Sequence, residues 1–290
     1  MKKVNYIILH YQVIADTIEC VESIIKLQDK DIEQKIIIVD NCSPNKSGEV
    51  LKEKYADSLN VIVILSETNL GFAKGNNLGC NFAIDNYEPD FLVVLNNDII
   101  INQKDFENKI IDLKISHNFD VLGPDIISLI DNLHQNPVDF AIVTKKAIIK
   151  EFLLLVFLLL LSFINLDQKF VFFWNEKKYK NRIAFSEYKN DVFRKNIKVH
   201  GAAVIFSKSY FKKFKDVFFD KTFMFLEEDI LYHRIRRNSM KVIYSNKINV
   251  FHKEDSATNS VFKKATAKRR FIYKNTIKSL YEYFRAYNTL

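Results

Sequence analysis

The stretch Phe91-Leu-Val-Val-Leu-Asn-Asn-Asp98 decides the fold, because a wholly apolar run ends abruptly in three polar residues. Three earlier runs share its nearly continuous apolar character: Val4–Leu9, Lys35–Val39 and Val61–Leu65. Strands that are buried on both faces of a parallel sheet show this pattern. Between these runs lie segments with the apolar spacing of helices, namely Asp16–Lys26, Lys46–Asp57 and Lys74–Asn86. The alternation predicts an α/β fold with a mostly parallel central sheet flanked by helices.

Polar residues follow three of these four strands. They are His10-Tyr11, Asp40-Asn41-Cys42-Ser43 and Asn96-Asn97-Asp98. Ligands of such sheets bind beyond the carboxyl ends of the strands. Asp and Asn are also common turn formers, so one such strand end alone is weak evidence. Together the three ends predict a ligand site at this edge of the sheet.

A glycine-rich segment follows the third strand, and it reads Asn69-Leu-Gly-Phe-Ala-Lys-Gly-Asn-Asn-Leu-Gly79. Glycine lets backbone approach a ligand closely, and a helix beginning near Lys74 would direct N–H groups and a lysine towards an anion. The glycine spacing differs from the dinucleotide-binding fingerprint, and the segment lacks the Gly-Lys-Ser/Thr of a Walker loop. The pattern alone favours ligand binding no more than it favours a simple glycine-rich turn.

Carboxylates at two further places are candidates for chemistry. Asp98, held at a strand end, suits Mg²⁺ or Mn²⁺ with diphosphate oxygens as the other ligands, although an ordinary turn is the alternative. Glu227-Glu228-Asp229 opens a helical segment, where acidic residues are common for dipole reasons alone. Crowded carboxylates raise one another's pKa, so one of these three is a candidate general base facing a cleft. His252 by itself is more typical of a packed residue than of a ligand.

In combination these motifs resemble those of the inverting family 2 glycosyltransferases. The matching positions are Asp40-Asn41-Cys42-Ser43, Asn69 to Asn77, Asn97-Asp98, Gly201-Ala202, Glu228-Asp229 with Arg234, and His252. The likeness is greatest to the bacterial rhamnosyltransferase-like members that build surface polysaccharides, and it covers roughly residues 4–258. Two positions depart from the pattern: Asn96 or Asn97 stands where many relatives carry Asp, and Leu231 where many carry a second acid.

The resemblance implies a nucleotide-sugar-binding fold of the GT-A type and a role for each matched residue. Asp229 would be the catalytic base with Glu228 as its support, and Asp98 and His252 would bind a divalent metal, Mg²⁺ or Mn²⁺. Tyr11 and Asp40 would contact the base and ribose of the nucleotide. The expected substrate-binding residues are Tyr11, Asp40, Asn41, Lys74, Asn76, Asn77, Asn97, Gly201, Ala202 and Arg234.

The same resemblance divides the chain. Residues 1–258 would form the GT-A domain, with a nucleotide-binding half over about 1–100 and an acceptor half over about 100–258. An apolar insertion would occupy about 140–195, and a basic helical tail would occupy 259–290. The expected reaction moves a sugar, rhamnose being one candidate, from a nucleotide-diphosphate donor to a hydroxyl of a saccharide or lipid-linked saccharide, with inversion. Bacterial surface polysaccharide or glycan synthesis is the expected pathway.

Charge and hydropathy suggest a membrane surface as a further partner. Residues 1–99 carry 9 Lys and Arg against 15 Asp and Glu, whereas the rest of the chain carries 34 against 20. The longest apolar run, Phe152–Ile164, is too short to span a bilayer and is a candidate for interfacial seating, burial or an oligomer contact. It is flanked by Lys145, Lys146, Lys150, Lys169, Lys177 and Lys178. Three widely spaced cysteines and no signal peptide indicate the cytoplasm, at the inner face of the cell membrane.

Two other classes of function fit part of the pattern. A basic nucleic-acid-binding protein would account for the pI near 9.1, but no nucleic-acid-binding motif accompanies the charge. A catalytically silent relative of the glycosyltransferases would keep the same motifs. A nucleotidyltransferase or a dinucleotide-dependent oxidoreductase is disfavoured, because no glycine-rich loop follows the first strand.

Overall fold

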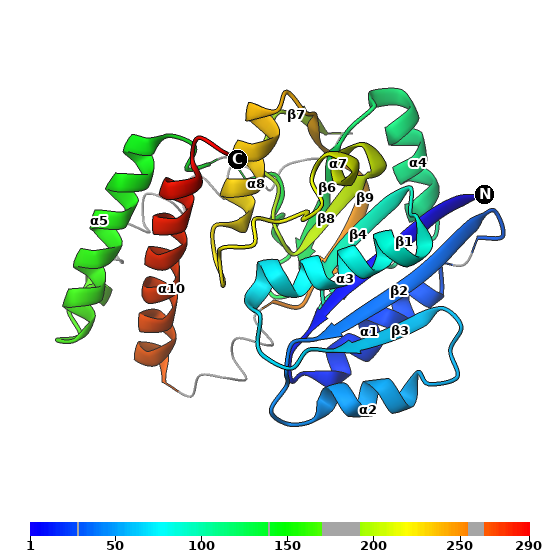
Figure 1. Ribbon diagram of the computed structural model, residues 1–290, viewed down its shortest axis with the longest axis horizontal. Coiled ribbons are helices and arrows are strands. Elements are labelled where there is room, and N and C mark those ends of the chain that lie inside the picture. Colours follow the sequence, from blue (N-terminus) through cyan, green and yellow to red (C-terminus); the bar gives the residue numbers. More distant parts are fainter. Residues whose placement is uncertain (28, 139, 170–191, 255–263) are drawn as a thin grey trace.

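The computed structural model describes residues 1–27, 29–138, 140–169, 192–254 and 264–290, and Figure 1 shows their arrangement. Within these residues nine strands form one sheet, flanked by helices, as predicted. The strands are β1 (Lys2–His10), β2 (Ile32–Asp40), β3 (Val61–Leu65), β4 (Phe91–Asn96), β5 (Ile99–Ile100), β6 (Val121–Ser128), β7 (Phe193–Lys195), β8 (Ala203–Ser207) and β9 (Val242–His252). The helices are α1 (Ile14–Ile25), α2 (Ser47–Lys54), α3 (Gly71–Tyr87), α4 (Phe106–His117), α5 (Lys145–Ser162), α7 (Lys208–Lys213), α8 (Glu227–Arg237) and α10 (Ala265–Ala286).

The first half of the sheet is parallel. Strands β3, β2, β1 and β4 lie side by side in that order, and the pairing of β1 with β2 runs without a break from Lys2 opposite Ile32 to His10 opposite Asp40. Strands β1 and β4 are buried over most of their length and β2 over its second half, which explains why their sequences are nearly continuous apolar runs, whereas the edge strand β3 is half-buried after Val61. The predicted strands and the edge at which their carboxyl ends meet are confirmed.

The second half of the sheet is mixed. Strand β8 lies antiparallel between β4 and β6, and β6 runs parallel to β9. The short strands β5 and β7 both pair antiparallel with β9. Residues Val242–His252 form one long strand, β9. The reversal of β8 brings its amino end, preceded by Gly201-Ala202, to the edge where the parallel strands end.

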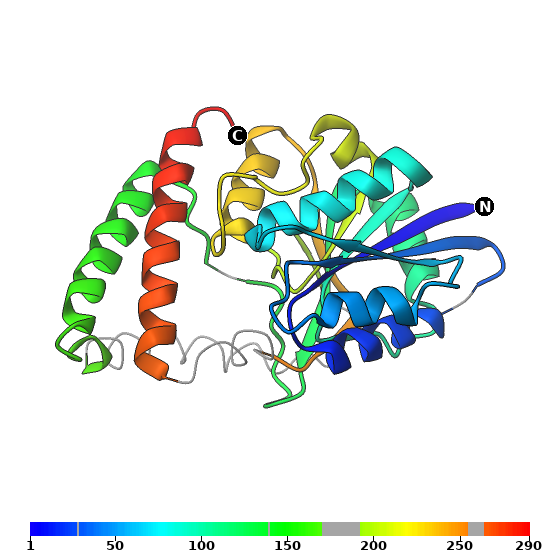
Figure 2. The ribbon, with the colours of Figure 1, turned by 60° about the horizontal axis from the view of Figure 1, so that its bottom comes forward.

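Helices cover both faces of the sheet, as Figure 2 shows for α1 and α2 below the strands and α3 above them. On one face, α1 and α4 pack their apolar side chains against inward residues such as Tyr6 and Ile8. On the other face, α3, α7 and α8 pack against Ile7, Val39 and Phe206. The sheet is therefore a rigid support for residues at its edge.

Asp16 and Ser47 are of residue types that often cap helices, but neither is an N-cap here. Helix α1 begins at Ile14, two residues before Asp16, and α2 begins at Ser47 with Lys46 as its N-cap. The Ser47 hydroxyl instead lies 2.8 Å from Nε2 of His10 and donates to Oδ1 of Asn45. Asp16 pairs with Lys253 at 2.8 Å. Tertiary partners thus take these side chains away from the helix ends.

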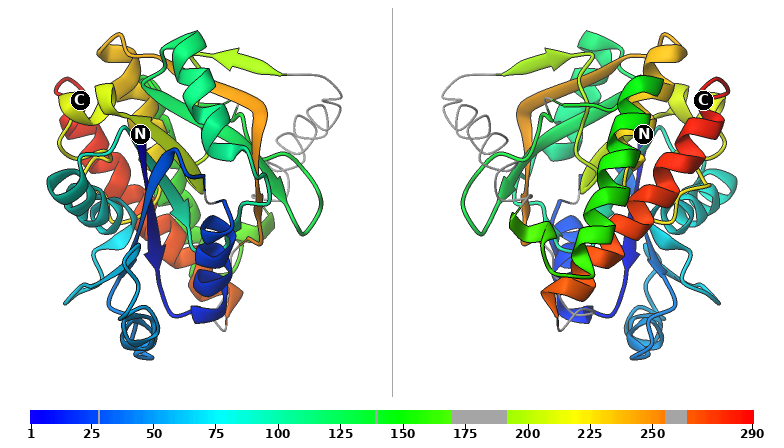
Figure 3. Two further views of the ribbon diagram at one scale, coloured as in Figure 1. Left: turned by 90° about the vertical axis from the view of Figure 1, so that its right-hand side faces the viewer. Right: turned by 90° about the vertical axis from the view of Figure 1, so that its left-hand side faces the viewer.

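Helices α5 and α10 form an antiparallel pair outside the sheet layers. The right view of Figure 3 shows the two helices side by side, and α5 is the outermost helix in Figure 1. At one end Arg269 of α10 donates to Asp167 at 2.7 Å, just beyond α5. At the other end Tyr283 of α10 donates to the carbonyl of Ile142, just before α5. Apolar side chains between these ties, including Leu155, Leu158 and Leu280, are buried together.

The predicted insertion over 140–195 is only partly within the described residues, and Lys177 and Lys178 lie outside them. Residues 145–162 of this region form α5. Among the described helices none combines the length and the hydropathy of a membrane span.

Candidate active site

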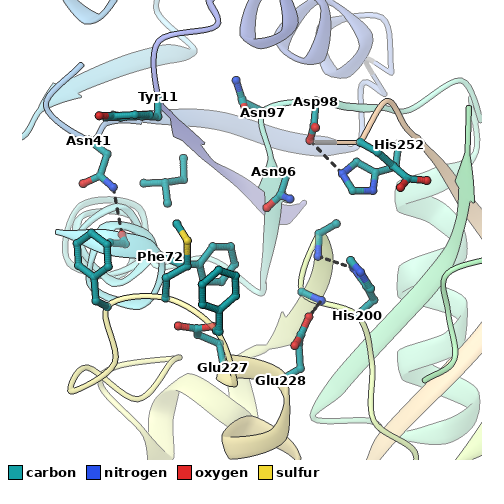
Figure 4. A pocket seen from close by; sticks show the side chains of 18 of the residues that line it. Tyr11, Asn41, Phe72, Asn96, Asn97, Asp98, His200, Glu227, Glu228 and His252 are labelled. Carbon is teal, nitrogen blue, oxygen red and sulfur yellow. Dashed lines mark hydrogen bonds and ion pairs between the residues drawn. The ribbon is translucent and has the colours of Figure 1, made fainter. Parts of the chain in front are cut away.

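A pocket of about 450 Å³ opens at the edge where β1 and β4 end and β8 begins. Its polar lining includes Tyr11, Asn97, Asp98, Glu228 and His252, which come from four separate segments of the chain. Figure 4 shows these groups arranged around the one opening. A pocket therefore lies at the edge where the sequence predicts a ligand site.

Asp98 and His252 lie together because β5 pairs with β9. Ile99, which follows Asp98, is the register partner of His252, and the amide of Lys253 donates to the Asp98 carbonyl at 3.1 Å. The Nε2 of His252 lies 3.2 Å from Oδ1 of Asp98. The other ring nitrogen, Nδ1, donates to Oε1 of Gln135 at 2.7 Å. Gln135 thereby orients the ring so that Nε2 faces the carboxylate.

Glu228 reaches the pocket from the first turn of α8. Phe225 and Leu226, with φ of 73° and 74°, turn the chain sharply into this helix. The carboxylate oxygen Oε1 of Glu228 accepts a hydrogen bond from the amide of Gly201 at 3.0 Å. A Cβ at position 201 would lie 3.1 Å from this same oxygen, so the absence of a side chain leaves room for the carboxylate. The Gly201 amide holds Glu228 in an orientation towards the pocket.

Asp229, predicted as the base facing the cleft, does not line the pocket. Its carboxylate is bound on both oxygens by the ammonium of Lys198 at 3.1 Å and accepts the Ile142 amide at 2.6 Å. Successive residues of a helix point about 100° apart, and in α8 it is the neighbour of Asp229 that lines the pocket. That residue is Glu228. Burial raises the pKa of Asp229, although the Lys198 ammonium opposes the shift.

Glu227 also lines the pocket, but its carboxyl is buried beneath the surface. Burial raises its pKa to about 8, and the nearby Glu228 carboxylate adds to the shift. Glu227 is consequently protonated at neutral pH, and its neighbour Glu228 provides the carboxylate at this side of the pocket.

Eight of the fourteen predicted site residues line the pocket: Tyr11, Asn41, Asn97, Asp98, Gly201, Ala202, Glu228 and His252. Asn41 is fixed by its own hydrogen bonds, since its amide donates to the Gly71 carbonyl and its oxygen accepts the Leu70 amide at 2.8 Å. Asn97 donates to Thr17 and to the Val13 carbonyl, which ties the end of β4 to the start of α1.

Five predicted substrate-binding residues are absent from the pocket lining: Asp40, Lys74, Asn76, Asn77 and Arg234. Asp40 is buried and accepts the Ser43 amide at 3.2 Å. Arg234 donates to the Asp216 carbonyl at 2.9 Å and stacks on Phe214. Each of the two side chains thus binds a backbone group of the protein itself.

The glycine-rich segment also serves packing more than phosphate binding. Helix α3 begins at Gly71, three residues before Lys74, so Lys74 points into solvent from the first turn. Gly71 has a φ of +75°, and a Cβ there would lie 2.0 Å from the Phe223 carbonyl oxygen. Asn77 holds Phe218 through both its amide group and its oxygen, each at 2.9 Å. The segment therefore fastens α3 to the chain that leads into α8.

An apolar wall of the pocket was not predicted as a site. Phe72, Phe223, Met224, Phe225 and Phe271 form it, together with polar His200 and Gln135 elsewhere in the lining. The aromatic run before Glu227 is visible in the sequence, but the same pattern is equally typical of residues in a hydrophobic core. Phe271 belongs to α10, and no local signal links that helix to residues 225 and 72.

The residues around Asp98 fit a divalent cation held jointly with a substrate. Among the described residues there is no group of three or more His, Cys, Asp or Glu side chains that would hold a metal alone. Asp98 and His252 offer two ligands that open onto the pocket. Mg²⁺ is commonly bound by one or two protein ligands with substrate phosphates and water completing its shell. The donor set thus suits a metal that arrives with a phosphorylated ligand.

In open α/β sheets ligands bind at the carboxyl edge of the parallel strands, which is where this pocket lies. Residues 6–215 match the family described as Glycosyl transferase family 2. The chain belongs to the glycosyl transferase family 2. No curated protein matches it.

Solved structures of S. aureus TarS share the fold. The TarS fragment 1–349 aligns with a TM-score of 0.54 at 15% identity, over 99% of this chain and 72% of the fragment. Its complex with UDP-GlcNAc aligns with a TM-score of 0.55 at 16% identity, over 90% of this chain and 62% of that one. The complex with UDP aligns with a TM-score of 0.50 at 17% identity, over 88% and 59%. These likenesses confirm the predicted GT-A architecture.

Proposed function

We propose that this protein transfers a sugar from a nucleotide-diphosphate donor to an acceptor hydroxyl, with inversion at the anomeric carbon. Its membership of the glycosyl transferase family 2 supports the reaction class. The observation that carries the proposal is that Asp98, His252 and Glu228 open onto one pocket at the sheet edge. One part of this pocket suits a metal-bound diphosphate, and another presents a carboxylate to an incoming hydroxyl.

The donor would lie across the ends of β1 and β4. Tyr11 and Asn41 are on the β1 and β2 side of the pocket, where they would contact the nucleoside. Asp98 and His252 would hold Mg²⁺ or Mn²⁺, which would offset the negative charge that develops on the diphosphate leaving group. The structural relatives crystallised with UDP and UDP-GlcNAc support a nucleotide-sugar donor.

Glu228 takes the role that sequence reasoning gives to Asp229. Its carboxylate accepts the acceptor's hydroxyl proton as the oxygen attacks the anomeric carbon from the face opposite the leaving group. The Gly201 amide holds the carboxylate in place during this step. Asp229 is unsuited to the role because Lys198 and the Ile142 amide already occupy its oxygens.

The Glu228→Gln variant tests the base. Glutamine keeps the side-chain length and an oxygen for the Gly201 amide, so the variant should fold normally. We expect kcat to fall by about 10²–10⁴-fold, which is the usual contribution of general base catalysis to the rate. The matched control is Glu53→Gln, an exposed glutamate of α2 whose substitution should leave kcat unchanged. Transfer by Glu228→Gln at the wild-type rate would exclude Glu228 as the base.

The Asp98→Asn variant tests the metal site. Isothermal titration calorimetry with the nucleoside diphosphate should show tighter binding by the wild-type protein when Mn²⁺ is present. We expect this Mn²⁺-dependent gain to disappear in Asp98→Asn, whereas binding without Mn²⁺ should change little. An unchanged gain in the variant would contradict the assignment.

The donor sugar and the pathway are finer parts of the proposal. The motifs resemble those of rhamnosyltransferase-like members, which favours a deoxysugar donor and a role in surface polysaccharide synthesis in the cytoplasm. Thermal shift measurements with UDP-, dTDP- and GDP-linked sugars, each with and without Mn²⁺, would identify the donor class. Stabilisation by a UDP-sugar in preference to dTDP-rhamnose would contradict the rhamnose assignment.

A further inference from the structure

A second groove lies at the end of helix α8 that is opposite Glu228. Its volume is about 510 Å³, and it shares no lining residue with the pocket. The loop after β7, the last turn of α8 and the start of β9 bound it, and Figure 1 shows β7 beside this end of α8. The lining residues are Asn196, Tyr232, Arg236, Ser239, Met240 and Lys241.

The chain around this groove is strongly basic. Residues 192–215 contain seven Lys and Arg, residues 230–253 contain six, and neither stretch contains an Asp or Glu. Arg236 and Lys241 are exposed and line the groove. Within the parts of the chain that the structure describes, neither side chain forms an ion pair, and the Arg236 guanidinium lies 5.8 Å from the centre of the Tyr232 ring. Positive charges without an acidic partner raise the local potential and attract anions.

One row of side chains connects the groove with the pocket. Glu228, Tyr232 and Arg236 are four residues apart along α8, so they lie along one side of the helix and span about 12 Å. The chain that precedes β8 runs beside this row in the opposite direction. Tyr232 donates to the Asn196 carbonyl at the groove, and the Gly201 amide donates to Glu228 at the pocket. An extended ligand with one end at Glu228 would therefore reach Arg236 along this row.

The groove suits the anionic groups of a saccharide chain. Guanidinium and ammonium groups bind carboxylates and phosphates, and the side chains of Asn196 and Ser239 can bond sugar hydroxyls. A lipid surface fits less well, because the lining is polar apart from Met240 and forms a groove. A nucleic acid would be attracted by the same charges, but the row that leads to Glu228 gives it no role.

We propose that Arg236 and Lys241 bind a negatively charged group of the acceptor, which is an anionic saccharide chain whose terminal hydroxyl reaches Glu228. This inference rests on the proposed transfer reaction and adds the chemical class of the acceptor. The two points of attachment lie about 12 Å apart along α8. The arrangement therefore favours a chain over a single sugar, which could occupy only one of them.

Isothermal titration calorimetry of the full chain with hexagalacturonate tests the groove. This probe carries a carboxylate on every sugar unit, and maltohexaose is its neutral counterpart. We expect hexagalacturonate to bind at least about tenfold more tightly than maltohexaose, with an affinity that falls as salt is added. Arg236→Gln/Lys241→Gln should raise the Kd for hexagalacturonate by about fivefold or more. The matched control, Lys146→Gln/Lys150→Gln, removes two exposed charges from α5 and should bind as the wild type does.

A cross-linking experiment tests the row that leads to the pocket. Hexagalacturonate with a diazirine at its non-reducing end should label the tryptic peptide 199–208 on irradiation, because this peptide contains the pocket residues Gly201 and Ala202. In Arg236→Gln/Lys241→Gln the labelling should fall by the same factor as the affinity.

Four results would overturn the proposal. They are equal affinities for hexagalacturonate and maltohexaose, unchanged binding by the groove variant, labelling outside residues 199–208, and tighter binding of a single-stranded oligonucleotide of equal charge. The last result would make nucleic acid the partner. The transfer reaction is tested separately, because the groove variant should keep the Mn²⁺-dependent binding of nucleoside diphosphate. A wild-type protein without that binding would contradict the proposed transfer, whereas the hexagalacturonate results would still decide the groove.

Discussion

Asp229→Asn should weaken folding strongly and leave the chemistry of the folded protein intact. The carboxylate of Asp229 and the ammonium of Lys198 are both almost fully buried, with side-chain exposures of 6% and 10%. Asparagine can still accept the Ile142 amide, but it leaves the ammonium buried without a countercharge. Removing one partner of a buried pair costs about 3–5 kcal/mol.

The loss of stability in Asp229→Asn comes mainly from the Lys198 ammonium, which stays buried without a countercharge, and less from the lost attraction between the two charges. Burial raises the pKa of Asp229 even beside Lys198, so the charged pair has little net favourable energy compared with neutral groups. We therefore expect a free energy of unfolding about 3 kcal/mol lower for Asp229→Asn. Lys198→Met combined with Asp229→Asn should recover most of this loss, because the uncompensated charge is then gone.

Urea unfolding followed by circular dichroism measures the change as a lower midpoint at constant slope. The matched control is Asp105→Asn, which breaks an exposed pair with Lys109 at 3.2 Å. Such exposed pairs contribute about 0.5 kcal/mol or less. An unchanged midpoint for Asp229→Asn would refute the buried pair. If the Asp229→Asn protein were folded and its kcat fell about 10²-fold, Asp229 and not Glu228 would be the catalytic base.

Two further substitutions probe the pocket rim. Burial holds the Glu227 pKa at about 8 against 4.5 in the unfolded chain, so between these pH values the folded state keeps a proton that the unfolded state releases. The free energy of unfolding should therefore fall by about 1.4 kcal/mol per pH unit over this window, and Glu227→Gln should remove this slope. Melting temperatures of the two proteins from pH 4 to pH 8 measure the effect. If the melting temperature of the variant depended on pH as that of the wild type does, the prediction would be contradicted. Gly71→Ala should cost at least about 2 kcal/mol, because alanine disfavours the positive φ and its Cβ meets the Phe223 carbonyl. In the same urea titration Lys74→Ala, an exposed change in the first turn of α3, should stay within about 0.5 kcal/mol of the wild type.

The parallel half of the sheet was predictable because its central strands, β1, β2 and β4, are largely buried on both faces. Such burial favours apolar residues at successive positions, and the sequence shows them as nearly continuous apolar runs. The rule that ligands bind at the carboxyl ends then located Tyr11, Asn41, Asn97 and Asp98. The second half was harder to predict, because β8 reverses direction and β9 follows a register with an irregularity opposite Pro124.

Long-range packing decided which polar residues serve the pocket. Asp40 and Arg234 look like binding residues in a motif, but each is used by a neighbouring backbone group. Phe271 shows the converse case, since a residue in the last helix reaches the pocket only because α10 packs beside the sheet layers.

The sequence alone determined the fold class, the edge that carries the pocket and the acidic cluster at the start of α8, because each follows from local patterns of burial and polarity. Only the tertiary structure decided that Glu228 lines the pocket and that Asp229 does not. The turn at Phe225 and Leu226 sets the rotation of α8, and Lys198, about thirty residues earlier in the chain, draws Asp229 to the other side. The rotation of a helix about its axis depends on contacts with distant segments, and a local pattern of residues does not predict those contacts.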